Sequence, residues 1–187
     1  MRAAFKDWAI IIDALGHGEQ IIILRKGGLA EGRGGFKVEH EEFLLFPTRY
    51  HQQGEMVVPT AVARHRQVEA AFPPEDVLRF EYCAKVVEWR EVTSLEKATG
   101  LRGQHIWSER VIADRYEWGR EQKIFAIALR VSRLPEPVEV PMLEEYGGCK
   151  SWIEVAGEID TSAAQPVLDD ESFAAQLTAF QQALGDG

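Results

Sequence analysis

The sequence has little cysteine and no long apolar run. Its two cysteines, Cys83 and Cys149, are too few for a disulfide framework, and no Cys-x-x-Cys pair suggests a zinc site. No stretch approaches the roughly 20 apolar residues that a helix needs to cross a bilayer. The apolar N-terminal run is interrupted by Asp7 and Asp13, so we do not expect a signal peptide. These absences predict a soluble, cytoplasmic protein with no membrane partner.

Positive charge is missing from the C-terminal part of the chain. From Ser151 onward there is no Lys or Arg, and seven carboxylates occur there: Glu154, Glu158, Asp160, Asp169, Asp170, Glu171 and Asp186. Of the net charge of −9, only −2 is left for residues 1–150. An acidic total argues against the counterion-driven binding of long DNA or RNA. It leaves open a pocket for a single base or nucleotide, and the acidic tail could bind a protein partner.

The length and composition fit one domain with an appendage. A chain of 187 residues that is 45% hydrophobic can bury a core without covalent staples. We expect residues 1–156 to form a single α+β domain and residues 157–187 to form an acidic linker and a C-terminal helix. Asp169 or Asp170 would cap that helix, and Phe173, Leu177, Phe180 and Leu184 share one of its faces.

Hydrophobic periodicity predicts more strand than helix in the body. We expect helices at 4–15 and 60–72 and two short helices after Ser94 and Ser108. The expected strands are 20–25, 43–46 (stopped by Pro47), 77–92, 123–134, a Pro-punctuated extended edge at 134–141, and a last strand within 146–155. Strands joined by hairpin-like loops, with helices inserted, favour an α+β fold with a small curved sheet or barrel.

Six strings in chain order together resemble a bacterial family called domain of unknown function 1802. They are AFKDWA (Ala4–Ala9), ILRKGGL (Ile23–Leu29), FLLFPTRYHQ (Phe43–Gln52), HIW (His105–Trp107), LRVSRLPEPV (Leu129–Val138) and YGGCKSWI (Tyr146–Ile153). The resemblance runs over residues 4–155 and leaves the tail after about residue 156 outside. It implies no particular activity.

A second resemblance concerns the layout of the chain. The order of a helix, GEQIIILRK (Gly18–Lys26), a long strand and KIFAIALRVSRLPEPVEVP (Lys123–Pro141) is similar to that of PUA-like barrels, particularly ASCH and EVE domains. This resemblance implies a PUA-like β-barrel with inserted helices, and a pocket on it that binds RNA or a modified nucleobase.

Two polar clusters follow predicted strand ends. Arg25 and Lys26, with Arg33, flank a glycine-rich loop in which backbone N–H groups and cations could share a phosphate. A hairpin with solvated charges explains the same residues. Thr48, Arg49, His51 and Gln52 make the second cluster, in which His51 could act as a base and Gln52 could bind a base edge. A turn whose polar groups satisfy the backbone is the alternative.

Two tryptophans and two acidic clusters complete the candidates. Trp107 and Trp152 could stack on a base, although tryptophan is also common at the edge of a core. The VEHEEF segment (Val38–Phe43) lacks a second histidine at i+4, so we expect no metal site there. Asp114, Glu121 and Lys123 imitate the core of restriction-type nucleases, a pattern that chance also produces.

Three functions remain open from these residues. The leading hypothesis is a PUA-like module that binds a nucleotide, a modified nucleobase or a short RNA or DNA, with no cofactor. Its ligand-binding residues would be Arg25, Lys26, Arg33, Thr48, Arg49, His51, Gln52, Trp107 and Trp152. One alternative is a metal-dependent nuclease or small hydrolase, including one linked to restriction-modification. The other is a protein-interaction module that uses the acidic tail.

Overall fold

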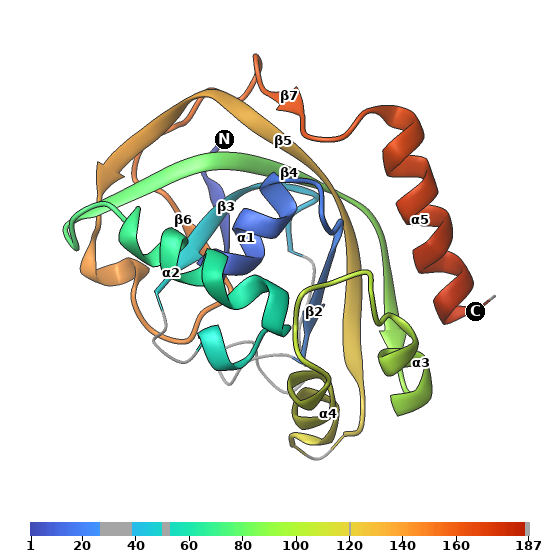
Figure 1. Ribbon diagram of the computed structural model, residues 1–187. Helices are drawn as coiled ribbons and strands as arrows, with labels where there is room; N and C mark the ends of the chain where they lie inside the picture. Colours follow the sequence, from blue (N-terminus) through green and yellow to red (C-terminus); the bar gives the residue numbers. More distant parts are fainter. Residues whose placement is uncertain (27–38, 50–52, 120, 186–187) are drawn as a thin grey trace.

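The computed structural model describes residues 1–26, 39–49, 53–119 and 121–185 (Figure 1). The strands are β1 (Ala3–Trp8), β2 (Ile22–Arg25), β3 (Glu42–Thr48), β4 (Val77–Val92), β5 (Ile124–Pro141), β6 (Trp152–Glu154) and β7 (Gln165–Pro166). The α-helices are α1 (Ala9–Gly16), α2 (Val62–Ala70), α3 (Leu95–Gly100), α4 (Glu109–Glu117) and α5 (Asp170–Leu184). Short 3₁₀ turns are η2 (Gln53–Glu55), η3 (Pro59–Ala61) and η4 (Glu144–Tyr146). The molecule is therefore mixed α+β, as the sequence predicts.

The described strands form one mixed sheet. Their order is β2-β5-β4-β3-β1-β6, and β7 pairs with β5 outside this path. β1 and β3 run parallel, whereas each of the other pairings is antiparallel. Because β1 and β3 are parallel, their carboxyl ends lie at the same edge of the sheet.

The long strands β4 and β5 give the sheet its curl. They pair along most of their length, with irregularities between Phe80 and Tyr82 and between Val86 and Glu88. A bulge bends the strand that contains it and increases its twist. Both strands accordingly sweep around the molecule as curved ribbons (Figure 1). The predicted small curved sheet with inserted helices and a C-terminal helix is thus confirmed.

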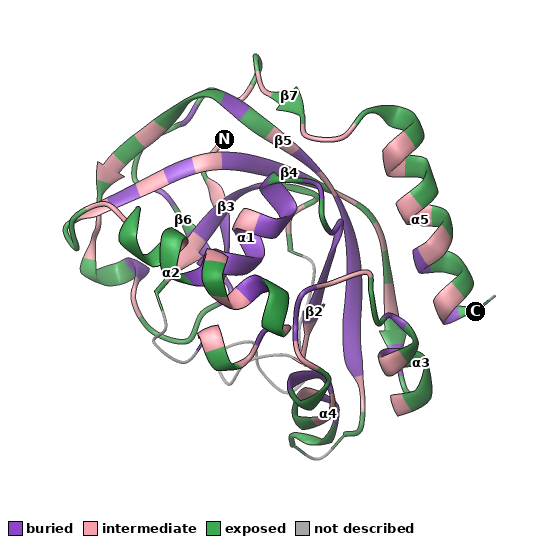
Figure 2. Ribbon diagram, viewed as in Figure 1, coloured by how far each residue is buried: buried purple, intermediate pink, exposed green. Residues whose placement is uncertain are grey.

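Helix α1 occupies the concave side of this curl. It contacts β3 and β5 and is covered by α2. Seven of its eight residues are buried, because its sequence AIIIDALG is apolar nearly all round (Figure 2). Burial of these side chains and of the facing strand residues makes the main core. A smaller cluster on the other face of β1, β3 and β4 includes Phe46, Phe80 and Tyr146.

The curl brings the two ends of the strand order together. Arg25, the last residue of β2, donates a 2.5 Å hydrogen bond to Ser151 Oγ, directly before β6. Its guanidinium also lies 4.0 Å from the Asp7 carboxylate on β1. Side chains, rather than a strand ladder, therefore join β2 to the opposite end of the sheet.

Three details of the predicted elements are wrong. Residues 4–15 are not one helix, because β1 covers residues 3–8 and α1 begins at Ala9. Pro47 does not stop the second strand but lies within β3. Residues 134–141 are not a separate edge, because they continue β5, and Pro135 and Pro137 fall where its register to β4 shifts between Arg133 and Val138. A bulge tolerates proline because the local ladder hydrogen bonds are already interrupted.

The C-terminal helix packs against the body. Asp169 caps it by accepting a 2.6 Å hydrogen bond from the Ser172 backbone N–H. Phe180 and Leu184 are buried in the main core, and Asp170 pairs with Arg130 on β5 at 2.7 Å. The division of the chain near residue 156 stays a prediction. No helix in the described part of the chain combines the length and apolar character required to span a bilayer.

Candidate functional site

A hollow lined by several charged side chains lies where β1 and β3 end. In the parallel register Asp7 stands opposite Pro47 and Trp8 opposite Thr48. The Thr48 hydroxyl donates a 2.9 Å hydrogen bond to the Asp7 carbonyl, which fixes the two strand ends to each other. The cavity measures about 860 Å³, a size that suits a small organic ligand. Its lining includes Lys6, Asp7, Trp8, Arg25, Phe46, Pro47, Thr48, Arg49, Phe72, Arg79, Lys150 and Ser151.

Asp7 is a buried carboxylate in this lining. Its side chain is almost fully buried, and Oδ1 accepts a 2.7 Å hydrogen bond from the Trp8 backbone N–H. Oδ2 has no hydrogen-bond partner among the residues that the structure describes. Burial raises the pKa of Asp7, and the positive charges of Arg25 and Arg115 oppose that rise. Buried acceptors are normally paired, so Oδ2 is an open position for a donor.

Arg25 is held beside Asp7 by three contacts. It donates to Ser151 Oγ, lies 4.0 Å from the Asp7 carboxylate, and stacks over the Phe5 ring with its guanidinium carbon 4.9 Å from the centroid. Its planar fork of donors is therefore fixed in direction at the wall of the hollow.

Lys6 brings a second buried cation to the hollow. Its ammonium donates to the carbonyls of Tyr146 at 2.6 Å and Gly148 at 2.9 Å. Burial is the main reason that the pKa of Lys6 is lowered, and the neighbouring Lys150 lowers it further. An ammonium has three donors, so one remains for a ligand.

Trp8 supplies an aromatic wall. The Arg115 guanidinium lies between the rings of Trp8 and Trp107, at 4.8 Å and 5.1 Å from their centroids, and donates to the Leu24 carbonyl at 2.8 Å. Burial lowers the pKa of Arg115 to about 10, which leaves it charged at neutral pH. Trp107 is 1% exposed, whereas Trp8 is half-buried and lines the hollow.

The charge of the lining differs in sign from that of the whole chain. Five cations (Lys6, Arg25, Arg49, Arg79 and Lys150) face two carboxylates (Asp7 and Glu75), a balance of +3. The chain as a whole carries −9. A cationic concavity in an acidic protein concentrates anions at one place on its surface.

The structure brings three of the nine predicted ligand-binding residues together. Arg25, Thr48 and Arg49 all line the hollow. Arg49 is exposed at its rim, stacks over Phe72 at 4.5 Å and donates to the Pro73 carbonyl. Arg33, His51 and Gln52 lie outside the described residues.

Three other predicted residues are engaged elsewhere. The Lys26 ammonium donates to the carbonyls of Tyr116, Glu121 and Lys123 and so binds the chain after α4. Trp107 is enclosed in the core, where its ring cannot stack on a ligand. Trp152 packs against Phe5 and Phe43, with ring centroids 4.8 Å and 4.9 Å apart. None of the three lines the hollow.

The residues that sequence reasoning missed are Lys6, Asp7, Trp8, Arg115 and Ser151. Lys6, Asp7 and Trp8 were assigned to a helix, on which Trp8 would belong to the apolar stripe. The sequence feature that could have indicated them is the charged pair Lys6-Asp7 within an otherwise apolar N-terminal run. Arg115 and Ser151 are over 90 residues from Asp7 in sequence, and only the closed curl of the sheet brings them near it.

The residues of the nuclease alternative are occupied by other contacts. Asp114 pairs with Arg110 on its own helix at 3.5 Å. Lys123 forms ion pairs with Glu91 and Glu121, at 3.1 Å and 2.8 Å. Among the described residues no group of three or more His, Cys, Asp or Glu could hold a metal ion.

Comparison with known proteins identifies the family. The profile of the domain of unknown function family DUF1802 matches residues 4–179, so the chain belongs to this family. The match extends beyond residue 156 into α5, which corrects the expectation that the tail lies outside the resemblance.

Similar folds occur among solved structures. The crystal structure of ASCH from Zymomonas mobilis has a TM-score of 0.46 and 13% identity, over 95% of this chain and 93% of that chain. A mutant of the same ASCH protein has a TM-score of 0.46 and 14% identity, over 94% and 96%. No curated protein matches the sequence.

Proposed function

We propose that this protein binds a nucleotide unit of RNA or single-stranded DNA, with the base in the hollow at the ends of β1 and β3. One observation carries the proposal: a buried carboxylate, Asp7, has one oxygen that accepts no hydrogen bond from any described residue, in a cavity whose other ionisable lining groups are mainly cations. A ligand that combines N–H donors with negative charge complements both features, and a nucleotide combines them.

The Asp7 carboxylate is suited to an amino-bearing base edge. A carboxylate accepts hydrogen bonds from the exocyclic amino group of cytosine, and the amino and imino groups of guanine are similar donors. Arg25 presents donors 4.0 Å away, so an acceptor and a donor stand side by side. Cytosine and guanine each carry an exocyclic amino donor on an edge that also bears an acceptor, whereas uracil has no amino group and its one N–H lies between two carbonyl acceptors. We therefore propose that they are preferred over uracil.

The Trp8 ring and the cations at the rim of the hollow are suited to the base and the phosphate of a nucleotide. Trp8 is half-buried in the lining, and its position is fixed by Arg115 on one side. Stacking on an aromatic side chain contributes about 1–3 kcal/mol per base. Arg49 and Lys150 are exposed at the rim, where a phosphate attached to the base through its sugar would lie.

The test is a titration with CMP, GMP, UMP and AMP by isothermal calorimetry on the full chain. We expect saturable binding of CMP or GMP, and at least a tenfold weaker Kd in Asp7→Asn, because one charge-assisted hydrogen bond is worth about 1.5–3 kcal/mol. The matched control is Asp114→Asn, which makes the same change at an exposed carboxylate on α4.

We expect Asp7→Asn to stay folded, because asparagine has nearly the same shape and its Oδ1 can still accept from the Trp8 backbone N–H. The folded protein raises the pKa of Asp7, so it disfavours the charged form, and a neutral asparagine removes that cost. A thermal melt of both variants checks this. Absence of binding for all four nucleotides, or equal affinity in wild type and Asp7→Asn, would overturn the proposal.

A further inference from the structure

A second hollow lies on the other side of Phe72 and Pro73. It measures about 460 Å³ and is walled by α1, α2, β3, β4 and β5. Its apolar surface comes from Ala9, Ile12, Leu45, Val68 and Ala71, and its polar groups are Asp13, His17, Arg64, Gln67, Arg79, Glu81, Tyr82 and Arg133. An apolar pocket of this size with a few convergent polar groups is typical of a site for a small ring system.

The two hollows share one wall. Pro47, Phe72, Pro73 and Arg79 line both of them. Phe72 is half-buried, and the Arg49 guanidinium lies over its ring at 4.5 Å on the side of the first hollow. The segment at Phe72 and Pro73 is therefore a ridge with a cavity on either side, and Arg79 is a cation common to both.

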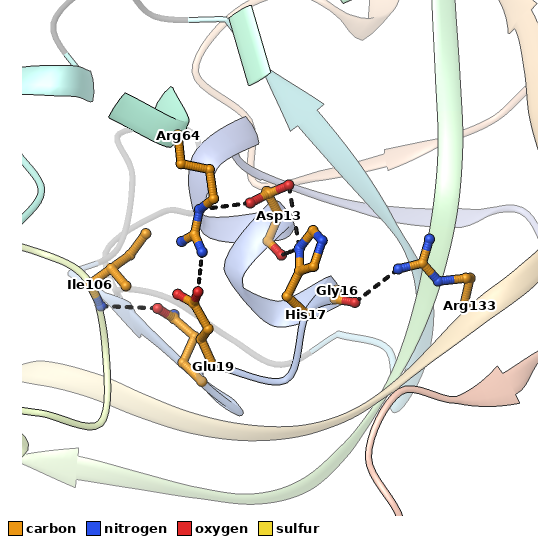
Figure 3. A network of polar contacts seen from close by, with 8 residues as sticks. Asp13, Gly16, His17, Glu19, Arg64, Ile106 and Arg133 are labelled. Atoms are coloured by element: carbon orange, nitrogen blue, oxygen red, sulfur yellow. Dashed lines mark hydrogen bonds and ion pairs between the residues drawn. The ribbon is translucent and has the colours of Figure 1, made fainter. Parts of the chain in front are cut away.

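Helices α1 and α2 contribute Asp13 and Arg64 to the polar lining of the second hollow. Arg64 lies between Asp13 and Glu19, with Arg64 Nε 2.9 Å from Asp13 Oδ2 (Figure 3). Arg64 Nη2 is buried and has no hydrogen-bond partner among the described residues. Burial is the main cause of the raised pKa of Asp13. The pair thus presents an unpartnered donor next to a carboxylate acceptor.

Arg133 and Tyr82 close the other end of the second hollow. Arg133 donates a 3.1 Å hydrogen bond to the Gly16 carbonyl (Figure 3). Its guanidinium lies 4.9 Å from the centre of the Tyr82 ring. Three arginines (Arg64, Arg79 and Arg133) face two carboxylates (Asp13 and Glu81), so this lining is also positive, by +1. Neutral apolar ligands would leave these charges and the open donor unsatisfied.

We infer that the ligand is at least two nucleotides long, and that the base next to the one held at Asp7 enters this second hollow across the ridge. The inference rests on the proposed function and adds the length of the ligand. A linking phosphate would cross the ridge beside Arg79 and Arg49. The second base would meet apolar walls and the donor–acceptor pair of Arg64 and Asp13.

The test compares mononucleotides with dinucleotides. CMP and GMP, and the same units extended by one nucleotide on either the 5′ or the 3′ side, are titrated into the full chain by calorimetry. We expect one of the two extensions to lower the Kd by about tenfold or more, the effect of one additional stacked and hydrogen-bonded base.

A variant that fills the second hollow isolates its contribution. Ala71 lines this hollow, and Ala71→Phe places a ring there without removing a polar group. Ala70→Phe is the matched control, because Ala70 is exposed on α2 and lines neither hollow. We expect Ala71→Phe to return the dinucleotide to the affinity of the mononucleotide and to leave mononucleotide binding unchanged, whereas Ala70→Phe alters neither.

The outcomes separate the two proposals. Mononucleotide binding without any gain on extension in either direction would overturn this inference and leave the proposed function intact. A gain that persists in Ala71→Phe would also overturn it, because the second base would then lie elsewhere. Failure of both mononucleotides and dinucleotides to bind would overturn the proposed function itself.

Discussion

At the scale of single residues, the site is built from charges that the fold disfavours. Asp7 has a raised pKa, and Lys6 and Arg115 have lowered ones, with burial as the first cause in each case. Such shifts mean that the folded chain gives up stability to keep these groups where they are. Groups of this kind concentrate at functional sites, although structural ion pairs produce them too. A structural ion pair does not explain why Asp7 Oδ2 accepts no hydrogen bond from the described residues.

His105 gives a pH-dependent prediction. Burial is the main cause that lowers its pKa from 6.5 to about 4, and Arg115 adds to the effect. Between pH 6.5 and 4 the unfolded chain binds this proton and the folded chain does not, so stability falls as the pH falls. The shift corresponds to about 3 kcal/mol when complete.

The measurement is urea unfolding at several pH values between 4 and 7. We expect His105→Gln to flatten the profile over this range relative to wild type. His17→Gln makes the same change at an exposed histidine and serves as the control for the substitution itself. An unchanged slope in His105→Gln would show that this histidine does not resist protonation.

At the scale of elements, the sequence predicts the long antiparallel strands and misses the first one. β4 matches its predicted bounds because its apolar residues, β-branched content and flanking turns all agree. In β1 four consecutive residues are buried, so its sequence carries no period of two. Phe5, Trp8 and Ile12 also fit a helical stripe. What makes residues 3–8 a strand is pairing with β3 and β6, which local sequence does not encode.

The difference between local sequence signals and long-range strand pairing also explains which residues of the hollow could be predicted. Arg25 ends one predicted strand, and Thr48 and Arg49 follow shortly after another; all three line the hollow. Asp7 and Trp8 were not identified as site residues because residues 4–15 were predicted to be a helix, whereas both lie on β1. Ser151 required the contact between the two ends of the sheet, which depends on the accumulated curl of β4 and β5 rather than on any short segment.

The end of α1 gives a prediction about packing. A Cβ on Gly16 would lie 2.2 Å from the Tyr82 ring, closer than atoms can approach. We therefore expect Gly16→Ala to destabilise the fold by about 1–3 kcal/mol, the usual range for overpacking. Gly157→Ala is the control, because nothing lies within 4 Å of its added Cβ. Equal midpoints in urea for the two variants would contradict this packing.

At the scale of the whole molecule, α5 completes the core although it carries much of the acidic tail. Phe180 is fully buried, and Gln176 and Gln181 donate to the Gly18 carbonyl and to Glu88, at 2.8 Å and 2.7 Å. The apolar face of the helix is thus used within the chain. A protein partner of the tail, which stays a prediction, would have to bind exposed carboxylates such as Glu158, Asp160 and Glu171.

Phe180 tests this docking. We expect Phe180→Ala to lower the free energy of unfolding by about 3–5 kcal/mol, as for other buried phenylalanines. Phe173→Ala, on the same helix but only partly buried beside Arg130, should cost clearly less. Denaturant unfolding of both variants gives the comparison. A small effect at Phe180 would mean that α5 contributes little to the stability of the body.

The contact between Arg25 and Ser151 has a consequence for how binding would be detected. These residues belong to opposite ends of the sheet, and within the described part of the chain no strand ladder connects β2 to β6. A ligand that engages both Arg25 on β2 and Asp7 on β1 would link the two ends of the sheet to each other, because β1 pairs with β6. Its occupancy should therefore appear as slower amide hydrogen exchange in β2 and β6, far apart in the chain, with little change in β7.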